Sequence, residues 1–437
     1  MPAVALSRSD PFLLPLLWVL MASAMLVESD TYRYATLALV ALSMIRFRDD
    51  VRLVSRDWLA WFCWLWAAYA AMRFVIGMTV HDVRGTSEWL YIFPLFFPAL
   101  GVALYKTRQY VFPAAIVLIA AGAVGLLASI DWAALRSGER VFPLFHNNPI
   151  HAAIGCGMLL VTSICWMLHV VETRRYDGWR LAAVLGMGFL TVLLSGIGIL
   201  GAQSKGVWLA LGPVAGFMSL AIVAFYGRRL ALAVLAVLLV AMLGIIVAQE
   251  DTRRVAGPTI EAAGELFSFG TEHVDPRDAM RRAVENPDTP QSMRERLMLW
   301  TNALDTVESS PWFGWGNLWQ DRWRQGTYQD TNHQLLHNGY LEILVRHGLF
   351  GTLVLAIFIL VSVRRIYVAR RQGIISASLM LYLYSLSLFF FITIATNSNN
   401  RLALGESYFL LAGAAVFAIS LAMRGERTKP ADIAQAD

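Results

Sequence analysis

Apolar runs long enough to cross a bilayer recur along this 437-residue chain, and they restrict its fold more than any other feature. Most cover roughly 17 to 25 residues, the length of a helix that spans a hydrocarbon core of about 30 Å. Hydrophobic residues make up 57% of the sequence, more than the roughly 45 to 50% of an ordinary globular domain. The runs do not alternate polar and apolar residues, as the strands of a membrane barrel do. The sequence therefore predicts an all-α polytopic membrane protein.

About twelve spans are obtained when the apolar runs are compared with the usual length of a membrane helix. They cover residues 11–27, 34–45, 57–77, 88–105, 111–129, 150–171, 180–198, 205–225, 230–248, 349–363, 374–396 and 404–423. The second and tenth are short, which leaves the exact number open. The first run has no convincing small-residue cleavage site, so we interpret it as a span and not as a signal peptide.

The spans divide the chain into three parts. Residues 1–248 hold spans 1 to 9, residues 249–348 form a polar segment, and residues 349–437 hold spans 10 to 12 and a tail. Basic residues gather in every second loop, which by the positive-inside bias makes those loops and both termini cytoplasmic. The polar segment then lies outside, and because it has few apolar residues we expect helices that lie on the transmembrane bundle. The net charge of +5 reports this topology and does not indicate nucleic-acid binding.

Several function classes lack their sequence signals. No GxxxxGK[ST] loop is present, and acidic residues are nearly absent from the span interiors, which argues against a nucleotide-driven pump and a proton relay. Cys63, Cys156 and Cys165 lie in apolar runs without paired spacing, so they predict neither disulfides nor a metal site. We expect no metal and no cofactor.

The stretch from His333 to Gly351 places titratable side chains where the polar segment meets the tenth span. Helical spacing relates Leu336, Tyr340, Ile343 and His347, which predicts a short interfacial helix before that span. His337 is the candidate functional group. An isolated interfacial histidine more often bonds only a neighbour or a lipid head group, but here cations from distant parts of the chain are expected at the same edge of the membrane.

Two cations stand out on that outer side. Lys205 opens the eighth span, where it opposes the helix dipole and occupies the side that disfavours positive charge, so an anionic partner is indicated. Snorkelling to the interface is the alternative. Arg296 shares a face with Trp300 on a predicted helix that ends at residues 309–311. A salt bridge to Glu295 or Asp305 is the alternative there.

Other outer polar residues are weaker candidates for substrate contacts. They are Asn338, Tyr340, Arg294, Arg254, Arg401, His146 and Asn148. Asn147 or Asn148 can instead cap the helix that begins at Pro149, and Arg401 can be an interfacial anchor. A water-accessible histidine with cations beside a bilayer suits a lipid-linked diphosphate.

Three segments together resemble the O-antigen ligase and polymerase superfamily of bacterial inner-membrane proteins. They are QSKGVWLAL at residues 203–211, RLMLWTNALDTVESSPWFGWG at 296–316 and HNGYLEILVRHGLFG at 337–351. A fourth, HNNPIHAA at 146–153, is similar to a weaker family element. The family usually shows S-R-G where this chain has Ser204, Lys205 and Gly206, and a lysine cannot bind a diphosphate in bidentate fashion.

The resemblance implies a GT-C-like glycosyltransferase architecture and transfer of a glycan from undecaprenyl diphosphate at the periplasmic face. It implies His337 as the base that deprotonates the acceptor, and Arg296 and Lys205 as ligands of the diphosphate, in a metal-independent inverting reaction. Ligases use lipid A-core as acceptor, polymerases a second lipid-linked repeat, and protein O-oligosaccharyltransferases a Ser or Thr. The short tail after Met423 and the long outer segment favour a ligase. A flippase is a further alternative, but it requires polar groups along a path between both faces.

Overall fold

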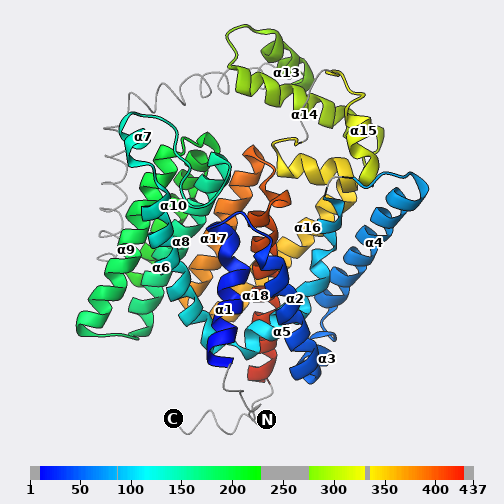
Figure 1. Cartoon of the computed structure of the whole chain (residues 1–437). Coiled ribbons are helices and arrows are strands. Elements are labelled where there is room, and N and C mark those ends of the chain that lie inside the picture. The colour runs from blue at the N-terminus through cyan, green and yellow to red at the C-terminus, as the bar shows by residue number, and fades with distance from the viewer. Residues whose placement is uncertain (1–9, 86, 228–274, 330–334, 428–437) are drawn as a thin grey trace.

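The computed structural model describes residues 10–85, 87–227, 275–329 and 335–427. Within these ranges the chain is built from helices joined by short loops (Figure 1). The predicted ninth span at 230–248 lies outside the described residues, as do Arg254 and His333.

Nine helices in the described ranges are long and apolar enough to cross a membrane. They are α4 (Trp58–Val80), η2 with α5 (Glu88–Phe96 and Phe97–Lys106), α6 (Val111–Ser129), α8 (Pro149–Thr173), α9 (Gly178–Gly201), α10 (Lys205–Tyr226), α16 (Gly339–Arg371), α17 (Ala377–Thr396) and α18 (Ala403–Arg427). The first two predicted spans coincide with shorter helices, α1 (Asp10–Ala22) and α2 (Thr31–Arg46). The prediction of an all-α polytopic membrane protein is confirmed.

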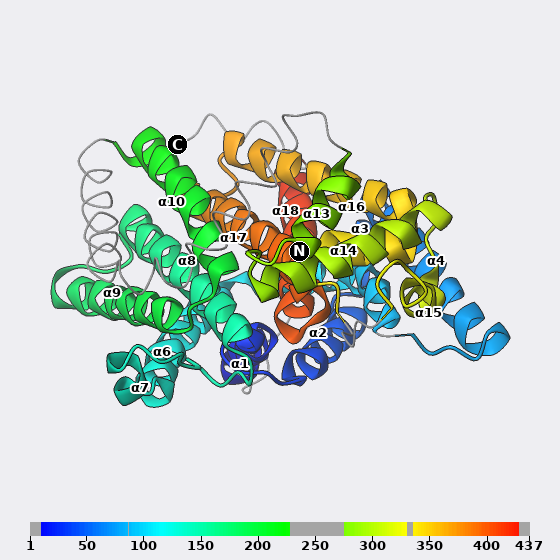
Figure 2. The same cartoon turned by 90° about the horizontal axis from the view of Figure 1, so that it is seen from above.

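The two ends of the bundle differ in what covers them. The first turn of α1, the last turn of α18 and the short helix α3 (Arg48–Val54) lie at one end (Figure 1). The other end carries α7 (Trp132–Arg136), α13 (Pro276–Glu285), α14 (Gln291–Ser309) and α15 (Trp319–Trp323). We call this second end the α14 face. Figure 2 looks down on it and shows α14 crossing over α16, against which it packs.

Two apolar clusters form the inside of the bundle. The first joins α6, α8, α9, α10 and α17, and the second joins α1, α2, α4 and α5. The last helix, α18, contributes to both clusters, with Leu404 in the first and Phe417 in the second. This central position of α18 fixes the loop that precedes it, which is part of the site described below.

The described part of the polar segment lies on the bundle, as the sequence predicts. Trp319 and Trp323 of α15 are fully buried against Leu299 of α14 and Val345 of α16. The core of this segment is therefore shared with a membrane helix. A second prediction is confirmed here, because α14 ends at Ser309 and is followed by a turn that contains Gly314 and Gly316 at positive φ.

A sharp kink at Gly348 divides α16 into a short helix and the tenth span, so the predicted short helix before that span is present. The short helix begins at Gly339, and Gly348, at φ 62° and ψ −159°, is not helical. At the kink, the N–H groups of Leu349 and Phe350 donate to the carbonyls of Pro311 (2.8 Å) and Trp312 (3.0 Å). These bonds satisfy the backbone where the helical ladder is interrupted. The conformation of Gly348 is accessible essentially only to glycine, and a Cβ there would lie 2.5 Å from the Trp312 backbone.

The predicted apolar stripe on this short helix is partly wrong. Leu336 and His337 lie before the helix and not on it, because Asn338 is the N-cap of α16. Ile343 and His347 are buried as expected, but Tyr340 is 39% exposed.

Candidate functional site

The cation Lys205 lies at the start of α10, as predicted, on the α14 face of the bundle. The positive charges of Arg296 and Arg140 act on it there, so three cations from separate segments meet. Arg140 comes from the loop before α8, and its Nε donates to the carbonyl of Ala202 at 2.8 Å, at the end of α9. We call Lys205, Arg140 and Arg296 the cation cluster.

Arg296 is half-buried on α14 and has no counter-ion among the described residues. It forms no hydrogen bond and no ion pair with any residue in the described ranges. The acids considered as its partners are engaged elsewhere, Asp305 with Thr327 and Glu295 with Gln291. The alternative of a salt bridge from Arg296 to either acid is therefore wrong in this structure. Loss of hydration without a compensating anion lowers the pKa of Arg296, and such a cation is suited to an anionic ligand.

His337 follows a backbone turn that α14 holds in place. Trp300 Nε1 donates to the carbonyl of Leu336 at 3.0 Å, and Trp300 is on the same side of α14 as Arg296, one turn further along. His337 itself has φ 51°, in the left-handed region that residues other than glycine rarely adopt. Its Nδ1 lies 3.2 Å from Oδ1 of Asn397, just after α17.

The start of α10 reaches the same loop from the other side. Gly206 packs so closely on Thr396 that a Cβ there would lie 2.1 Å from the Thr396 hydroxyl oxygen. Thr396 precedes Asn397, the partner of His337, and Gly206 follows Lys205. The three residues predicted from the sequence to be catalytic, Lys205, Arg296 and His337, therefore border one site on the α14 face.

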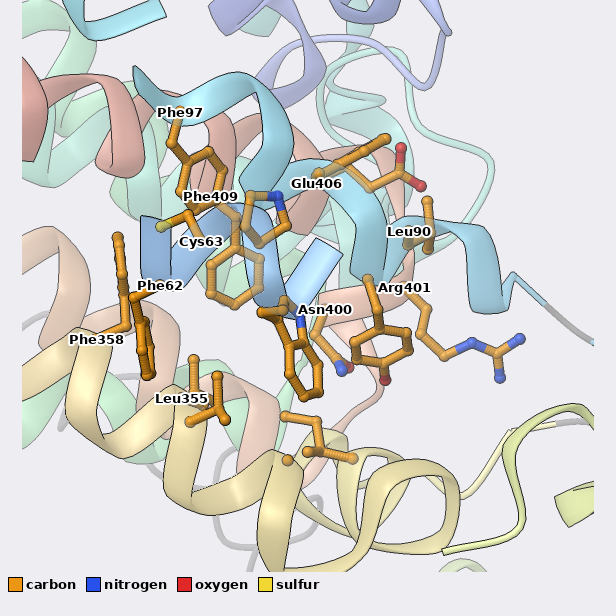
Figure 3. A pocket seen from close by; sticks show the side chains of 17 residues that line it. Phe62, Cys63, Leu90, Phe97, Leu355, Phe358, Asn400, Arg401, Glu406 and Phe409 are labelled. Atoms are coloured by element: carbon orange, nitrogen blue, oxygen red, sulfur yellow. The ribbon is translucent and has the colours of Figure 1, made fainter. Parts of the chain in front are cut away.

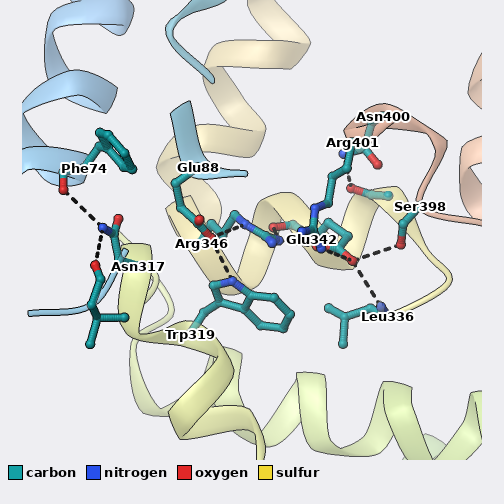
Figure 4. Close-up of polar contacts among 12 residues, drawn as sticks. Phe74, Glu88, Asn317, Trp319, Leu336, Glu342, Arg346, Ser398, Asn400 and Arg401 are labelled. Atoms are coloured by element: carbon teal, nitrogen blue, oxygen red, sulfur yellow. Dashed lines mark hydrogen bonds and ion pairs between the residues drawn. The ribbon is translucent and has the colours of Figure 1, made fainter. Parts of the chain in front are cut away.

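A buried cluster of charges lies beside this site (Figure 4). Glu342 accepts hydrogen bonds from Arg346 and from Arg401, the latter at 3.2 Å. Arg346 also donates through Nε to Glu88 at 2.9 Å, and its guanidinium stacks on the Trp319 ring at 4.3 Å. Two carboxylates and two guanidiniums thus pair with each other, which is the condition under which buried charges are tolerated. Arg296, in contrast, pairs with no carboxylate in the described ranges.

Other predicted substrate residues have structural partners. Asn148 caps α8 by accepting from the Ile150 N–H at 2.8 Å, which confirms the capping prediction, and Asn338 caps α16 in the same way. The Tyr340 hydroxyl donates to the Phe391 carbonyl at 2.9 Å. Roles for Asn148, Asn338 and Tyr340 in substrate binding stay predictions.

His146, Arg294 and Arg401 also contact the protein itself. His146 is buried, with Nε2 3.2 Å from the Met25 carbonyl, and burial lowers its pKa. Arg294 donates to three carbonyls of the turn before α14, the closest that of Asn286 at 3.1 Å. Arg401 pairs with Glu342 and is not part of the cation cluster. The third cation of that cluster is Arg140, which the sequence did not single out.

Several residues at the site carried weak sequence signals. Glu342 and Arg346 stand four apart, the spacing of a helical ion pair, but nothing in the sequence indicated that Glu88 would join them. Asn397 and Ser398 are part of a polar run between two spans, which marks a loop without marking its partner. Arg140 was visible only as one outer arginine among many.

An apolar hollow of about 880 Å³, open space at its mouth included, lies below the site between α4, α5, α16 and α18 (Figure 3). Phe62, Phe97, Leu355 and Phe358 are among the residues that line it. Asn400 and Arg401 line its polar end. Its lining is suited to hydrocarbon.

Comparison with known proteins agrees with the motifs at this site. The sequence model of the O-antigen ligase family matches residues 189–356, a stretch that contains Lys205, Arg296 and His337. An uncharacterized protein of Haemophilus influenzae is 22% identical over 366 residues, which cover 80% of this chain and 84% of the relative. Residues 189–356 are therefore similar to the O-antigen ligase family.

Proposed function

We propose that the chain is an O-antigen ligase. It would transfer an O-antigen polysaccharide from undecaprenyl diphosphate to lipid A-core oligosaccharide, during lipopolysaccharide biosynthesis. The observation that carries the proposal is the half-buried Arg296, which has no counter-ion among the described residues and lies with Lys205 beside the His337 turn. Similarity to the O-antigen ligase family over residues 189–356 independently supports a membrane enzyme that joins glycans.

The cation cluster would bind the diphosphate of the donor. The guanidinium of Arg296 can present paired N–H groups to the phosphate oxygens, while the Lys205 ammonium acts as a point charge. Arg140 adds positive charge nearby although its Nε is engaged. These cations would stabilise the charge that develops on the leaving group as its bond to the sugar breaks.

His337 would act as the general base. The amide of Asn397 donates through Nδ2 to Oδ1 of Asn399 at 2.6 Å, so its oxygen faces His337 as an acceptor. This arrangement favours a proton on Nδ1 of His337 and a lone pair on Nε2. Nε2 would take the proton of the acceptor hydroxyl as its oxygen attacks the anomeric carbon and undecaprenyl diphosphate leaves with the bonding electrons. A single displacement inverts the anomeric configuration.

The membrane orientation follows from the same proposal. The α14 face would be periplasmic and the opposite end, with both termini, cytoplasmic, in the bacterial inner membrane. The apolar hollow offers space for hydrocarbon next to the site, in line with lipid-linked substrates.

Reconstitution with purified protein tests the proposal. The protein is incubated with an undecaprenyl-diphosphate-linked glycan and, in separate reactions, with lipid A-core, a second lipid-linked repeat or a Ser/Thr-containing acceptor protein. A ligase forms product only with lipid A-core, and activity persists in EDTA because the cations are side chains. Product with the lipid-linked repeat alone would identify a polymerase, product with the acceptor protein alone an oligosaccharyltransferase, and no new glycosidic bond with any acceptor would contradict an enzymatic role.

A further inference from the structure

One buried carboxylate, that of Glu342, lies between the residue before His337 and the loop that contacts the His337 ring. Glu342 Oε1 accepts the N–H of Leu336 at 3.0 Å and the hydroxyl of Ser398 at 2.9 Å. Leu336 immediately precedes His337, and Ser398 immediately follows Asn397, whose amide oxygen contacts the histidine ring. This oxygen of Glu342 thus connects Leu336 to Ser398 (Figure 4). Through these two neighbours it links the segments that carry His337 and Asn397.

The backbone at His337 needs such support. A left-handed residue other than glycine costs about 1 to 2 kcal/mol, and it persists only where the surrounding structure holds it. Leu336 is held on one side by the Trp300 indole, which takes its carbonyl, and on the other by Glu342, which takes its N–H. Both hydrogen-bonding groups of the residue before the histidine are therefore fixed.

Glu342 is itself held rigidly. Arg346 and Arg401 donate to its other oxygen, and Arg346 connects it to Glu88, to which Trp319 also donates at 2.9 Å. The carboxylate is completely buried, so its acceptor sites are used by protein donors and not by water. Neither oxygen is placed to act on a substrate, which separates Glu342 from the catalytic groups.

We infer that Glu342, acting with Ser398, is a positioning residue for His337. It fixes the left-handed turn and the Asn397 loop together, so that the His337 ring keeps the orientation in which Nε2 accepts the substrate proton. This inference rests on the proposed function only for its kinetic consequences. The hydrogen bonds that it assigns to Glu342 can be tested without any substrate.

The main experiment removes only the Ser398 hydroxyl. Ser398→Ala should lower kcat by about ten- to a hundredfold with little change in KM, because a small misplacement of a reacting group has an effect of that order. Ser407→Ala is the matched control, since Ser407 is equally buried and its hydroxyl donates to the Met21 carbonyl, away from the site. In a His337→Ala background, Ser398→Ala should have no further effect on the residual rate. An equal loss in both backgrounds, or unchanged kcat in Ser398→Ala, overturns the inference.

Hydrogen exchange supplies the test that needs no activity. Glu342→Asp keeps the charge that pairs with both arginines but withdraws the carboxylate by one methylene. Exchange at residues 335–341 should become faster in this variant, while exchange in α3, at the opposite end of the bundle, stays unchanged. Unchanged exchange at 335–341 would overturn the inference even if no glycan acceptor were ever found. Wild-type inactivity with normal protection of this turn would instead refute the proposed function alone.

Discussion

Two arginines near the proposed catalytic site allow a ligand-binding cation to be distinguished from a structural one by substitution. Arg296 has no ion pair among the described residues, whereas Arg401 pairs with the buried Glu342 at 3.2 Å. Replacing each by methionine removes the charge and keeps most of the apolar stem. Arg401→Met should mainly lower the stability of the protein, and Arg296→Met should mainly lower its activity.

The expected magnitudes follow from the partners. Removing one member of a buried ion pair typically costs about 3 to 5 kcal/mol, and Arg401→Met should fall near the lower value because Arg346 still pairs with Glu342. Arg296→Met breaks no ion pair and relieves repulsion on Lys205, so the protein should be as stable as wild type or slightly more so. If Arg296 binds the diphosphate, its loss should cost about 1.5 to 3 kcal/mol in the transition state. That corresponds to a rate roughly ten- to a hundredfold lower.

The assay compares the two variants in one detergent at matched protein concentration. Thermal unfolding gives the stability order, and initial rates of glycan transfer give the activity. The reasoning predicts a lower unfolding midpoint for Arg401→Met and an unchanged midpoint with reduced rate for Arg296→Met. A midpoint for Arg296→Met as low as that of Arg401→Met would show that Arg296 has a structural role, and an unchanged rate would remove it from the site.

Four further predictions concern single positions. His337→Ala should lower the transfer rate by about a hundred- to ten-thousandfold, as expected for loss of a general base, while membrane insertion and expression stay normal; wild-type lipopolysaccharide capping in cells that carry this variant would refute the role. Lys205→Arg should retain much of the activity, whereas Lys205→Ala should lose about ten- to a hundredfold, from a lost hydrogen bond to a charged group; equal, near-normal rates for both would mean that Lys205 only reaches the head groups. Gly348→Ala should destabilise the protein by about 1 to 3 kcal/mol because of its backbone conformation, whereas Gly196→Ala, with no neighbouring atom within 4 Å, should not; similar unfolding midpoints for the two variants would argue against the kink as observed. Burial lowers the pKa of His146 below its ordinary value of 6.5, so neutral His146 contributes to stability above that pH and this contribution is lost on acidification. His146→Gln should therefore weaken the loss of stability between about pH 7.5 and 5.5. An unchanged pH profile would contradict this.

The sequence by itself determined the membrane architecture and the identity of the principal candidate residues. Long apolar runs can satisfy their backbone in lipid only as helices, so length and hydropathy alone located the spans. The cost of a cation at the outer start of a span was enough to mark Lys205, and a helical face marked Arg296. These signals are local, which is why they can be read along the chain.

Only the tertiary structure decided which polar groups are paired and which are left for a ligand. The sequence marks both Arg296 and Arg401 as outer arginines, but Glu342 lies against Arg401 and no carboxylate among the described residues reaches Arg296. The kink at Gly348 likewise depends on carbonyls of residues 311 and 312, which replace part of the helical ladder. Ion pairing and backbone capping of this kind depend on distances between segments far apart in the chain. Neither composition nor periodicity encodes those distances, because they are set by how the helices pack.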